Sequence, residues 1–292
     1  MKFFICPGAQ KAGTTKLYNL LKFHPEINLS EIKESKYFLK HIKDISKEKF
    51  LEFFSNSDSQ LHGEIDPEYI YYEDTSQKIK ETLGKDVKFI FMLRNPVDRA
   101  YSHYWMSFRR GFELLNFDDA IKAEKERLEN KEKHAIWHYS YLDRGFYFKQ
   151  IENYLKVFDL DQMHFVIFEE FVSNMQIELN KIYDFLDITP HDITEEIINE
   201  KSNEGNYPKS EFLRKLHGQP SRLKSILKVL IPFKKLRWWI YPIIEKFNSG
   251  SKKYEKIDPK LKQELLTSFF LEDIKNLQKL TGKDLENIWI NN

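Results

Sequence analysis

Short apolar runs alternate with amphipathic segments along the first two thirds of the chain. The runs 3–6, 87–93 and 164–169 are almost continuously apolar, which predicts buried strands. Predicted helices, with apolar residues at helical spacing or with helix start and stop signals, cover 46–56, 75–83, 96–110, 116–133 and 174–186. Because strands alternate with helices, the pattern predicts an α/β fold with a central parallel sheet flanked by helices.

The first strand runs into a glycine-containing loop and then into a helix. Pro7 and Gly8 end the strand, and Leu17, Leu20 and Leu21 lie on one face of the helix. A loop at a helix N-terminus points backbone N–H groups at one spot, where the helix dipole favours an anion. This stretch predicts a phosphate-type site, with a purely structural turn as the alternative.

The spacing of this loop differs from that of a nucleotide-kinase P-loop. Gly8 and Gly13 have the separation of the Walker pattern, but Thr14 stands where that pattern has its Lys. The lysine of this loop, Lys11, lies inside it. The arrangement resembles the 5′-phosphosulfate loop of sulfotransferases that use 3′-phosphoadenosine 5′-phosphosulfate (PAPS). By that resemblance the residues expected to hold the 5′-phosphosulfate are Lys11, Ala12, Gly13, Thr14, Thr15 and Lys16.

A second strand end carries the features of another anion site. Arg94 directly follows the apolar run 87–93, Pro96 suits the first turn of a helix, and Ser102 lies two turns further on. Arg makes bidentate contacts with phosphate, and a Ser hydroxyl adds a donor. This matches the motif that holds the 3′-phosphate in the same family. The two sites together give the resemblance to PAPS-dependent sulfotransferases, in their bacterial and heparan-sulfate-type branch, over most of 2–190.

The resemblance also implies a general base. Glu34, shortly before the aromatic pair 37–38, matches the Glu that has this role in the family. Removing the proton of an acceptor hydroxyl as it attacks sulfur lowers the barrier. A solvated charge in a Glu/Lys-rich loop is the alternative interpretation. His41, His62 and His103 are the other candidates, because His is the base in the small-molecule branch of the superfamily.

One position departs from the family pattern. The family often has Glu-Lys followed by Ser or Thr and Pro where this chain has the segment 64–67, Glu-Ile-Asp-Pro. The family Lys lies near the transferred group, and Ile65 removes that cation. We expect Lys11 to carry more of the charge stabilisation, or another lysine such as Lys36 to reach in.

The character of the chain changes from Lys201 onward. The segment 221–247 is basic and rich in apolar and aromatic residues. It predicts either a helical lid packed on the sheet domain or a peripheral contact with a membrane or lipid-linked acceptor. Ser251, Lys252 and Lys253 resemble the basic loop that closes over the 3′-phosphate in the heparan-type branch, with Lys in place of Arg. A solvated linker is the alternative there.

Composition narrows the class of protein. The chain has 292 residues, and we expect a single sulfotransferase domain over 1–292, with an α/β core to about residue 200 and a helical lid and C-terminal region after it. A net charge of +1 gives no global basic field for nucleic acid. The single cysteine, Cys6, excludes an internal disulfide. No signal peptide or membrane-length apolar run is evident, so we expect a cytoplasmic protein.

The expected activity is therefore in-line transfer of a sulfuryl group from PAPS, without a metal. Glu34 is expected to deprotonate the acceptor, and Lys11 to stabilise charge on the bridging oxygen. The branch suggests a carbohydrate or glycolipid acceptor with a reactive hydroxyl or amine. A P-loop kinase or NTPase and a non-catalytic adenosine-bisphosphate-binding protein are the alternatives. The sequence leaves acceptor identity and oligomeric state open.

Overall fold

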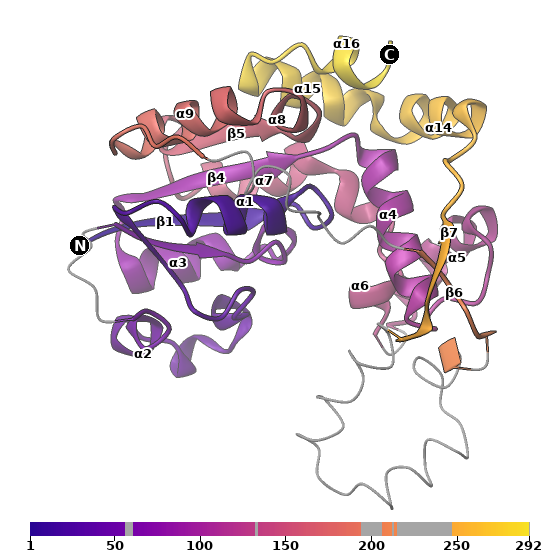
Figure 1. The fold of residues 1–292 in the computed structure, drawn as a ribbon, viewed down its shortest axis with the longest axis horizontal. Coiled ribbons are helices and arrows are strands. Elements are labelled where there is room, and N and C mark those ends of the chain that lie inside the picture. The colour runs from indigo at the N-terminus through magenta and orange to yellow at the C-terminus, as the bar shows by residue number, and fades with distance from the viewer. Residues whose placement is uncertain (56–60, 132–133, 194–205, 212, 215–246, 292) are drawn as a thin grey trace, which may run out of the picture. The chain divides into compact units, whose positions relative to one another are not determined.

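The computed structural model describes residues 1–55, 61–131, 134–193, 206–211, 213–214 and 247–291. It divides into two compact units, which are described here one at a time. The first unit comprises Met1–Pro96, Phe146–Ser202 and Gln263–Asn292, and the second comprises Val97–Gly145 and Asn203–Lys262. Figure 1 shows the elements of both units, coloured along the chain.

Five parallel strands form the sheet of the first unit, in the order β2-β3-β1-β4-β5. They are β1 (Lys2–Gly8), β2 (Ile27–Leu29), β3 (Leu61–Ile65), β4 (Val87–Leu93) and β5 (Met163–Ile167). Every residue of β2 and β3 is buried, as is every residue of β1 after Lys2. Burial of successive residues is typical of parallel strands covered on both faces. The prediction of a central parallel sheet is confirmed.

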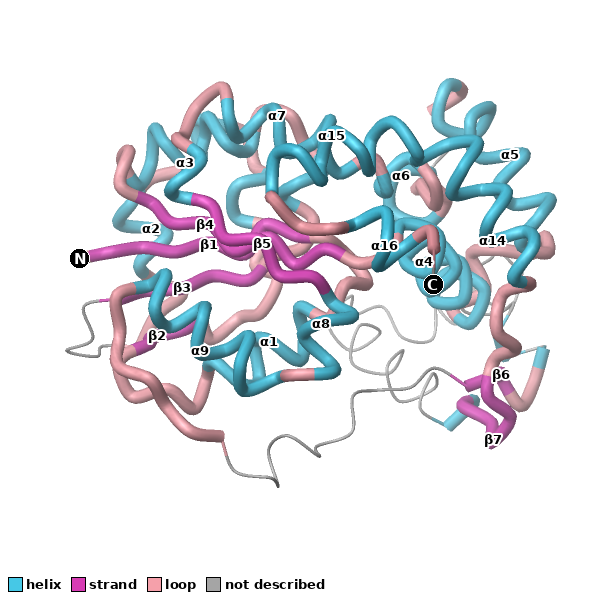
Figure 2. Tube along the Cα trace, turned by 90° about the horizontal axis from the view of Figure 1, so that it is seen from above, coloured by secondary structure: helices cyan, strands magenta, loops and turns pink. Residues whose placement is uncertain are grey.

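Helices cover both faces of this sheet (Figure 2). On one face lie α1 (Thr14–Leu21), α8 (Phe168–Ser173) and α9 (Met175–Leu186); on the other lie α3 (Thr75–Leu83) and α7 (Tyr147–Leu155). Leu17, Leu20 and Leu21 are fully or almost fully buried, as the spacing of the first helix predicts. Short helices, α2 (Lys47–Leu51) and α16 (Leu285–Trp289), complete the unit together with α15 (Leu271–Thr281).

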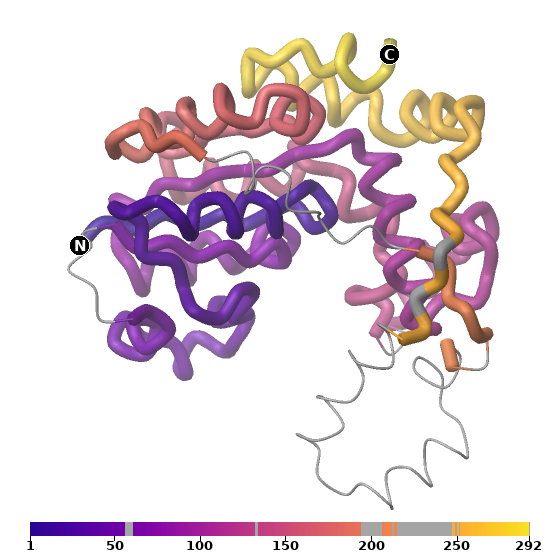
Figure 3. The backbone as a smooth tube through the Cα atoms, in the orientation of Figure 1, coloured from indigo at the N-terminus to yellow at the C-terminus, as the bar shows by residue number. Residues whose placement is uncertain are grey.

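Helix α15, near the end of the chain, packs on α7, which is far away in sequence (Figure 3). The carboxylate of Asp273 on α15 accepts a hydrogen bond from the backbone N–H of Phe148 on α7 at 3.1 Å. Burial raises the pKa of Asp273 to about 6. The chain end therefore belongs to the sheet-containing unit.

The second unit combines helices with one antiparallel strand pair. It contains most of α4 (Pro96–Arg109), all of α5 (Phe117–Glu129) and α6 (Ala135–His138), the pair β6 (Asn206–Pro208) and β7 (Ser249–Lys253), and the start of α14 (Pro259–Leu265). The rings of Trp105 on α4 and Tyr254 after β7 stack with centroids 4.1 Å apart. This contact fixes the strand pair on α4.

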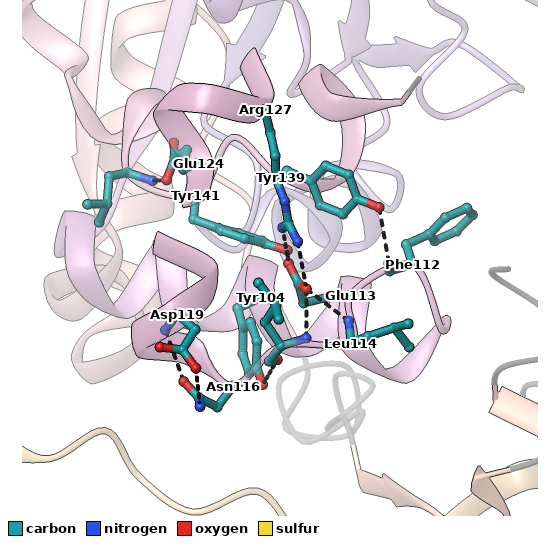
Figure 4. Close-up of polar contacts among 12 residues, drawn as sticks. Tyr104, Phe112, Glu113, Leu114, Asn116, Asp119, Glu124, Arg127, Tyr139 and Tyr141 are labelled. Atoms are coloured by element: carbon teal, nitrogen blue, oxygen red, sulfur yellow. Dashed lines mark hydrogen bonds and ion pairs between the residues drawn. The ribbon is translucent and has the colours of Figure 1, made fainter. Parts of the chain in front are cut away.

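A buried carboxylate organises the turn after α4 (Figure 4). Glu113 is fully buried and accepts hydrogen bonds from Arg127 Nη1 at 2.6 Å and from the Tyr141 hydroxyl at 2.8 Å. The backbone N–H groups of Leu114 and Leu115 also donate to it, at 2.8 and 2.9 Å. Both oxygens of this buried carboxyl group are thus hydrogen-bonded.

Three predicted boundaries and one omission are corrected by the structure. The helix expected over 116–133 is α5, whose last residue is Glu129. The strand expected over 164–169 ends at Ile167, because Phe168 begins α8. The helix expected over 46–56 is the shorter α2, whose N-terminus is capped by the Ser46 side chain. Strand β3 was not predicted from the sequence.

Candidate functional site

The loop between β1 and α1 lies against the end of β4. The N–H of Ala9 donates to the carbonyl of Met92 at 2.6 Å. Lys11 and Gly13 have left-handed backbone angles, with φ 70° and 89°. A Cβ on Gly13 would lie 2.8 Å from the ring of Phe168, so this position has room only for glycine. The loop thus reaches the N-terminus of α1 by a tightly constrained path.

The N-terminus of α1 supplies donors that suit a phosphate group. The N–H groups of Thr14 and Thr15 belong to the first turn, which has no intrahelical acceptors for them. The N–H of Lys16 donates back to the Gly13 carbonyl at 2.9 Å. The side chain of Thr14 is buried and that of Thr15 is exposed, whereas Lys11 and Lys16 are half-buried. Backbone donors, the helix dipole and two nearby lysines fit the 5′-phosphosulfate.

Arg94 connects the end of β4 to this loop. Its Nη1 donates to the carbonyl oxygen of Lys11 at 3.2 Å, and its guanidinium lies 4.7 Å from the centre of the Phe168 ring. The hydroxyl of Tyr147 donates to the Arg94 carbonyl at 2.9 Å. Phe168 is also the ring that borders Gly13. The two segments predicted to bind anions are therefore in direct contact within the first unit.

The residue after Arg94 is fixed by a closed set of three hydrogen bonds. The backbone N–H of Asn95 donates to Glu169 Oε1 at 3.0 Å, and its side-chain Nδ2 donates to the Trp289 carbonyl at 3.0 Å. The indole Nε1 of Trp289 donates to Glu169 Oε2 at 3.0 Å. Because both oxygens of Glu169 are used, the start of α8 and the C-terminal helix α16 together hold the backbone beside Arg94.

Glu34 lies in a turn beside the end of β3. Its N–H donates to the Ile65 carbonyl at 3.3 Å, and Ile65 pairs in register with Cys6 of β1. The carboxylate of Glu34 is 40% exposed and contacts Lys33 Nζ. Glu34 and Lys36 both have left-handed backbone angles, with φ 61° and 57°. Such angles are uncommon outside glycine and cluster at functional sites, which supports a role for this turn.

The segment that departs from the family pattern is fully buried. Ile65 packs in the core, and the carboxylate of Asp66 accepts N–H groups from Lys36 at 2.7 Å and Glu68 at 3.2 Å. Burial raises the pKa of Asp66 to about 6. Burial, with the nearby Asp66 carboxylate as a second cause, raises the pKa of Glu64 to about 8. Two carboxyl groups with unlike pKa values therefore stand beside the Glu34 turn.

Ser102 lies in the second unit. It is half-buried on α4, the same helix that carries Trp105. Trp105 stacks on Tyr254, which directly follows the basic strand β7. The helix with Ser102 and the strand with the predicted basic residues are thus packed together in one unit.

The two lysines of β7, Lys252 and Lys253, are both exposed. Lys252 Nζ lies 3.4 Å from a carboxylate oxygen of Glu255 and 5.1 Å from the centre of the Tyr207 ring. The side chain of Ser251 lies outside the described part of the chain, although its backbone belongs to β7.

The three histidines considered as bases lie in different surroundings. His41 is exposed, directly after the aromatic turn that follows Glu34. His62 is buried in β3, its ring 5.1 Å from that of Phe54, and burial lowers its pKa. His103 is fully buried in the second unit, with Nε2 3.1 Å from the Trp137 carbonyl.

Among the residues that the structure describes, no three or more His, Cys, Asp or Glu side chains are grouped so as to hold a metal ion. The helices of that same part include none with the length and hydropathy needed to cross a bilayer. The predicted lid or membrane-contact segment 221–247 lies outside the described residues, apart from its exposed last residue, Phe247.

The sequence analysis did not identify Phe168 and Gln10 as neighbours of the predicted anion sites. The pattern placed Phe168 inside a strand, although the acidic pair 169–170 after it is typical of the first turn of a helix. Gln10 Nε2 donates to Glu68 Oε1 at 2.7 Å. This hydrogen bond joins the loop between β1 and α1 to the turn after β3. No sequence signal indicated that contact, because its partners are 58 positions apart.

Comparison with known proteins agrees with these features. Residues 2–216 match the family model of the sulfotransferase domain. Human heparan sulfate glucosamine 3-O-sulfotransferase 3B1 is 28% identical over 185 residues, which are 61% of this chain and 44% of that protein. Human carbohydrate sulfotransferase 15 is 23% identical over 270 residues, covering 71% of this chain and 47% of that protein. The chain thus spans less than half the length of these curated relatives.

One solved structure is similar in fold to this chain. The crystal structure of a sulfotransferase from Alicyclobacillus acidocaldarius matches with a TM-score of 0.68 at 23% identity, covering 99% of this chain and 98% of that one. This likeness concerns the fold, whereas the family model rests on sequence. Because the family model matches well over half of the chain, this protein belongs to the sulfotransferase-domain family.

Proposed function

We propose that this chain transfers the sulfuryl group of PAPS to a hydroxyl or amine of a carbohydrate. The contact between Arg94 and Lys11 carries the proposal. PAPS bears a 5′-phosphosulfate and a 3′-phosphate on a single ribose, so a protein that binds it needs two cationic or N–H-rich sites close together. The phosphosulfate loop and the Arg94 turn meet that requirement within one unit.

The residues have distinct roles in this proposal. The 5′-phosphosulfate is bound by the phosphosulfate loop, by residues Lys11, Ala12, Gly13, Thr14, Thr15 and Lys16. Arg94 binds the 3′-phosphate in this proposal. The roles of Ser102, Ser251, Lys252 and Lys253, which lie in the second unit, stay predictions from the family resemblance. Arg supplies a bidentate fork for phosphate, whereas Lys acts as a point charge.

The reaction is an in-line displacement at sulfur. Glu34 takes the proton of the acceptor hydroxyl or amine while that atom forms its bond to sulfur. The bond between sulfur and the 5′-phosphate oxygen breaks, and adenosine 3′,5′-bisphosphate (PAP) leaves. Lys11 stabilises the charge that develops on this leaving oxygen, and no covalent intermediate with the protein forms.

A carbohydrate acceptor is supported by the names of the relatives. One is named for glucosamine in heparan sulfate and the other for carbohydrate sulfation. Free glycans and glycolipids present the same hydroxyl and amine chemistry, and both belong in the acceptor screen.

The test is transfer of labelled sulfuryl from PAPS to a panel of desulfated heparan sulfate, other glycans and glycolipids, without added metal. Glu34→Gln is expected to abolish transfer while PAP affinity remains within about twofold of wild type. Glu31→Gln, a matched change at an exposed glutamate of the same loop, is expected to retain transfer. Binding of PAP without transfer to any acceptor would favour a non-catalytic PAP-binding protein instead.

A further inference from the structure

The turn that carries Glu34 is fastened to the end of β3 residue by residue. Its three consecutive residues, Glu34, Ser35 and Lys36, bind three consecutive residues at the strand end. The Glu34 N–H donates to the Ile65 carbonyl at 3.3 Å, the Ser35 hydroxyl donates to the Glu64 carboxyl group, and the Lys36 N–H donates to Asp66 Oδ2 at 2.7 Å.

Asp66 uses its two carboxylate oxygens to accept backbone N–H groups from two different segments. Its side chain is fully buried, and its second oxygen, Oδ1, accepts the N–H of Glu68 at 3.2 Å. Its backbone N–H donates to the Cys6 carbonyl of β1 at 3.1 Å. A carboxylate can hold two N–H groups on two segments at once, one per oxygen. Asp66 therefore joins the Glu34 turn to the turn that begins at Glu68.

The turn at Glu68 contacts the segment before α1, which is proposed to bind the 5′-phosphosulfate of PAPS. Glu68 Oε1 accepts a hydrogen bond from Gln10 Nε2 at 2.7 Å, and Gln10 directly precedes the phosphosulfate loop. A chain of three hydrogen bonds thus runs from Lys36 through Asp66 and Glu68 to Gln10. All four residues belong to the first unit.

The left-handed backbone of the Glu34 turn needs contacts such as this one to hold its conformation. Glu34 and Lys36 have φ 61° and 57°, which cost free energy for residues with a Cβ. A strained conformation persists only where surrounding contacts hold it, and Asp66 supplies one of those contacts. The family pattern has Ser or Thr at this position, whose single hydroxyl oxygen is a smaller acceptor than a carboxylate.

We propose that Asp66 is a positioning residue, which fixes the Glu34 turn relative to the phosphosulfate loop. Asp66 acts through the backbone of the turn and does not contact the reacting atoms. This inference rests on the proposed function, because it assigns to the turn the base of the transfer reaction. Its consequence is that loss of the carboxylate slows transfer without weakening donor binding.

The test compares Asp66→Asn and Asp66→Ser with wild type. Asn keeps the shape but replaces one acceptor oxygen by an NH₂ group, and Ser keeps one acceptor in a smaller side chain. Asp74→Asn, at an exposed aspartate paired with Lys78, is the matched control. PAP binding is measured by calorimetry, kcat and KM are measured for transfer from PAPS to desulfated heparan sulfate, and backbone hydrogen exchange is followed over 31–39.

Asp66→Asn is expected to lower kcat roughly 100-fold, because it lets the Glu34 carboxylate move. A displacement of a catalytic group by about 1 Å has an effect of that size. The KM for the acceptor and the Kd for PAP should stay within about threefold of wild type. Exchange of the amides of Glu34 and Lys36 should be about tenfold faster, with the rest of the sheet unchanged. Asp66→Ser should fall between Asn and wild type, and Asp74→Asn should match wild type.

Any of three results would overturn the proposal. One is a kcat of Asp66→Asn within about threefold of wild type. Another is unchanged exchange at Glu34 and Lys36, and the third is a loss of PAP affinity in proportion to the loss of kcat. If wild type transfers nothing to any acceptor, the proposed function fails, and the exchange measurement still decides whether Asp66 holds the turn.

Discussion

The guanidinium of Arg94 donates a hydrogen bond to the carbonyl oxygen of Lys11 at 3.2 Å. This contact joins the end of β4 to the loop after β1, and the Phe168 ring lies against both segments. A change in either segment is therefore expected to alter the binding of both anionic groups of one ligand.

Arg94→Lys should weaken PAP binding although it retains the positive charge. Lys lacks the planar fork that contacts the Lys11 carbonyl, lies over the Phe168 ring and is proposed to bind the 3′-phosphate. The expected increase in Kd is about tenfold, the equivalent of one charge-assisted hydrogen bond. Calorimetry measures it, with Lys275→Ala at an exposed lysine as the control for charge. Equal affinities of Arg94→Lys and wild type would contradict a bidentate role.

Gly13→Ala should weaken PAP binding, because the added Cβ is strained at positive φ and clashes with a neighbouring ring. A control glycine with a positive φ but no close neighbour separates these two effects. Gly13 has φ 89°, and an added Cβ would lie 2.8 Å from the Phe168 ring. Gly84 has a similar φ of 93° with nothing within 4 Å of the added Cβ. Both alanine variants should lose about 1–3 kcal/mol of stability, because a residue with a Cβ is strained at positive φ. Only Gly13→Ala should weaken PAP binding, and equal PAP affinities of the two variants would argue against a tight loop.

Glu113→Ala should strongly destabilise the second unit. The change leaves Arg127, which is 16% exposed, without its buried carboxylate, and it removes the acceptor of Tyr141. Breaking a buried pair from one side costs about 3–5 kcal/mol. Urea denaturation measures the loss. Glu129→Ala, which removes an exposed ion pair with Lys125, should leave the midpoint unchanged. Similar midpoints for the two variants would contradict a structural role for Glu113.

Glu64→Gln should flatten the dependence of stability on pH. The folded-state pKa of Glu64 is about 8, above its ordinary value of 4.5, so the folded protein holds a proton that the unfolded chain releases. The stability from this protonated group is fully present below pH 4.5 and is lost as the pH rises through 8. The urea midpoint of wild type should fall between pH 5 and about 8.5, and that of Glu64→Gln should fall less. Equal slopes in the two proteins would contradict the raised pKa.

The local hydrophobic pattern predicted the two strands that end at the proposed PAPS-binding segments. The apolar runs before Gly8 and Arg94 are continuous, because parallel strands are buried on both faces. Strand β3 escaped this criterion, since His62, Gly63 and Glu64 interrupt its apolar residues even though all of them are buried. The burial of two ionisable side chains in a strand has no local sequence signal.

Contacts between distant segments explain the rest of what sequence reasoning missed. Glu34 was identified from a resemblance, but the attachment of its turn to Asp66 joins positions 30 residues apart. The sequence analysis considered the cation that Ile65 removes from the family pattern. It did not predict that the neighbouring Asp66 binds the backbone of the Glu34 turn. Such pairings depend on the order of strands in the sheet, and the local pattern does not specify that order.

The most direct test is calorimetric titration of the purified, metal-free protein with PAP, with ATP, and with ATP plus Mg²⁺. The account predicts tight binding of PAP that needs no metal and is lost in Arg94→Ala, together with weaker binding of ATP in either form. Preference for ATP with Mg²⁺ over PAP would contradict it and would favour the kinase or NTPase alternative.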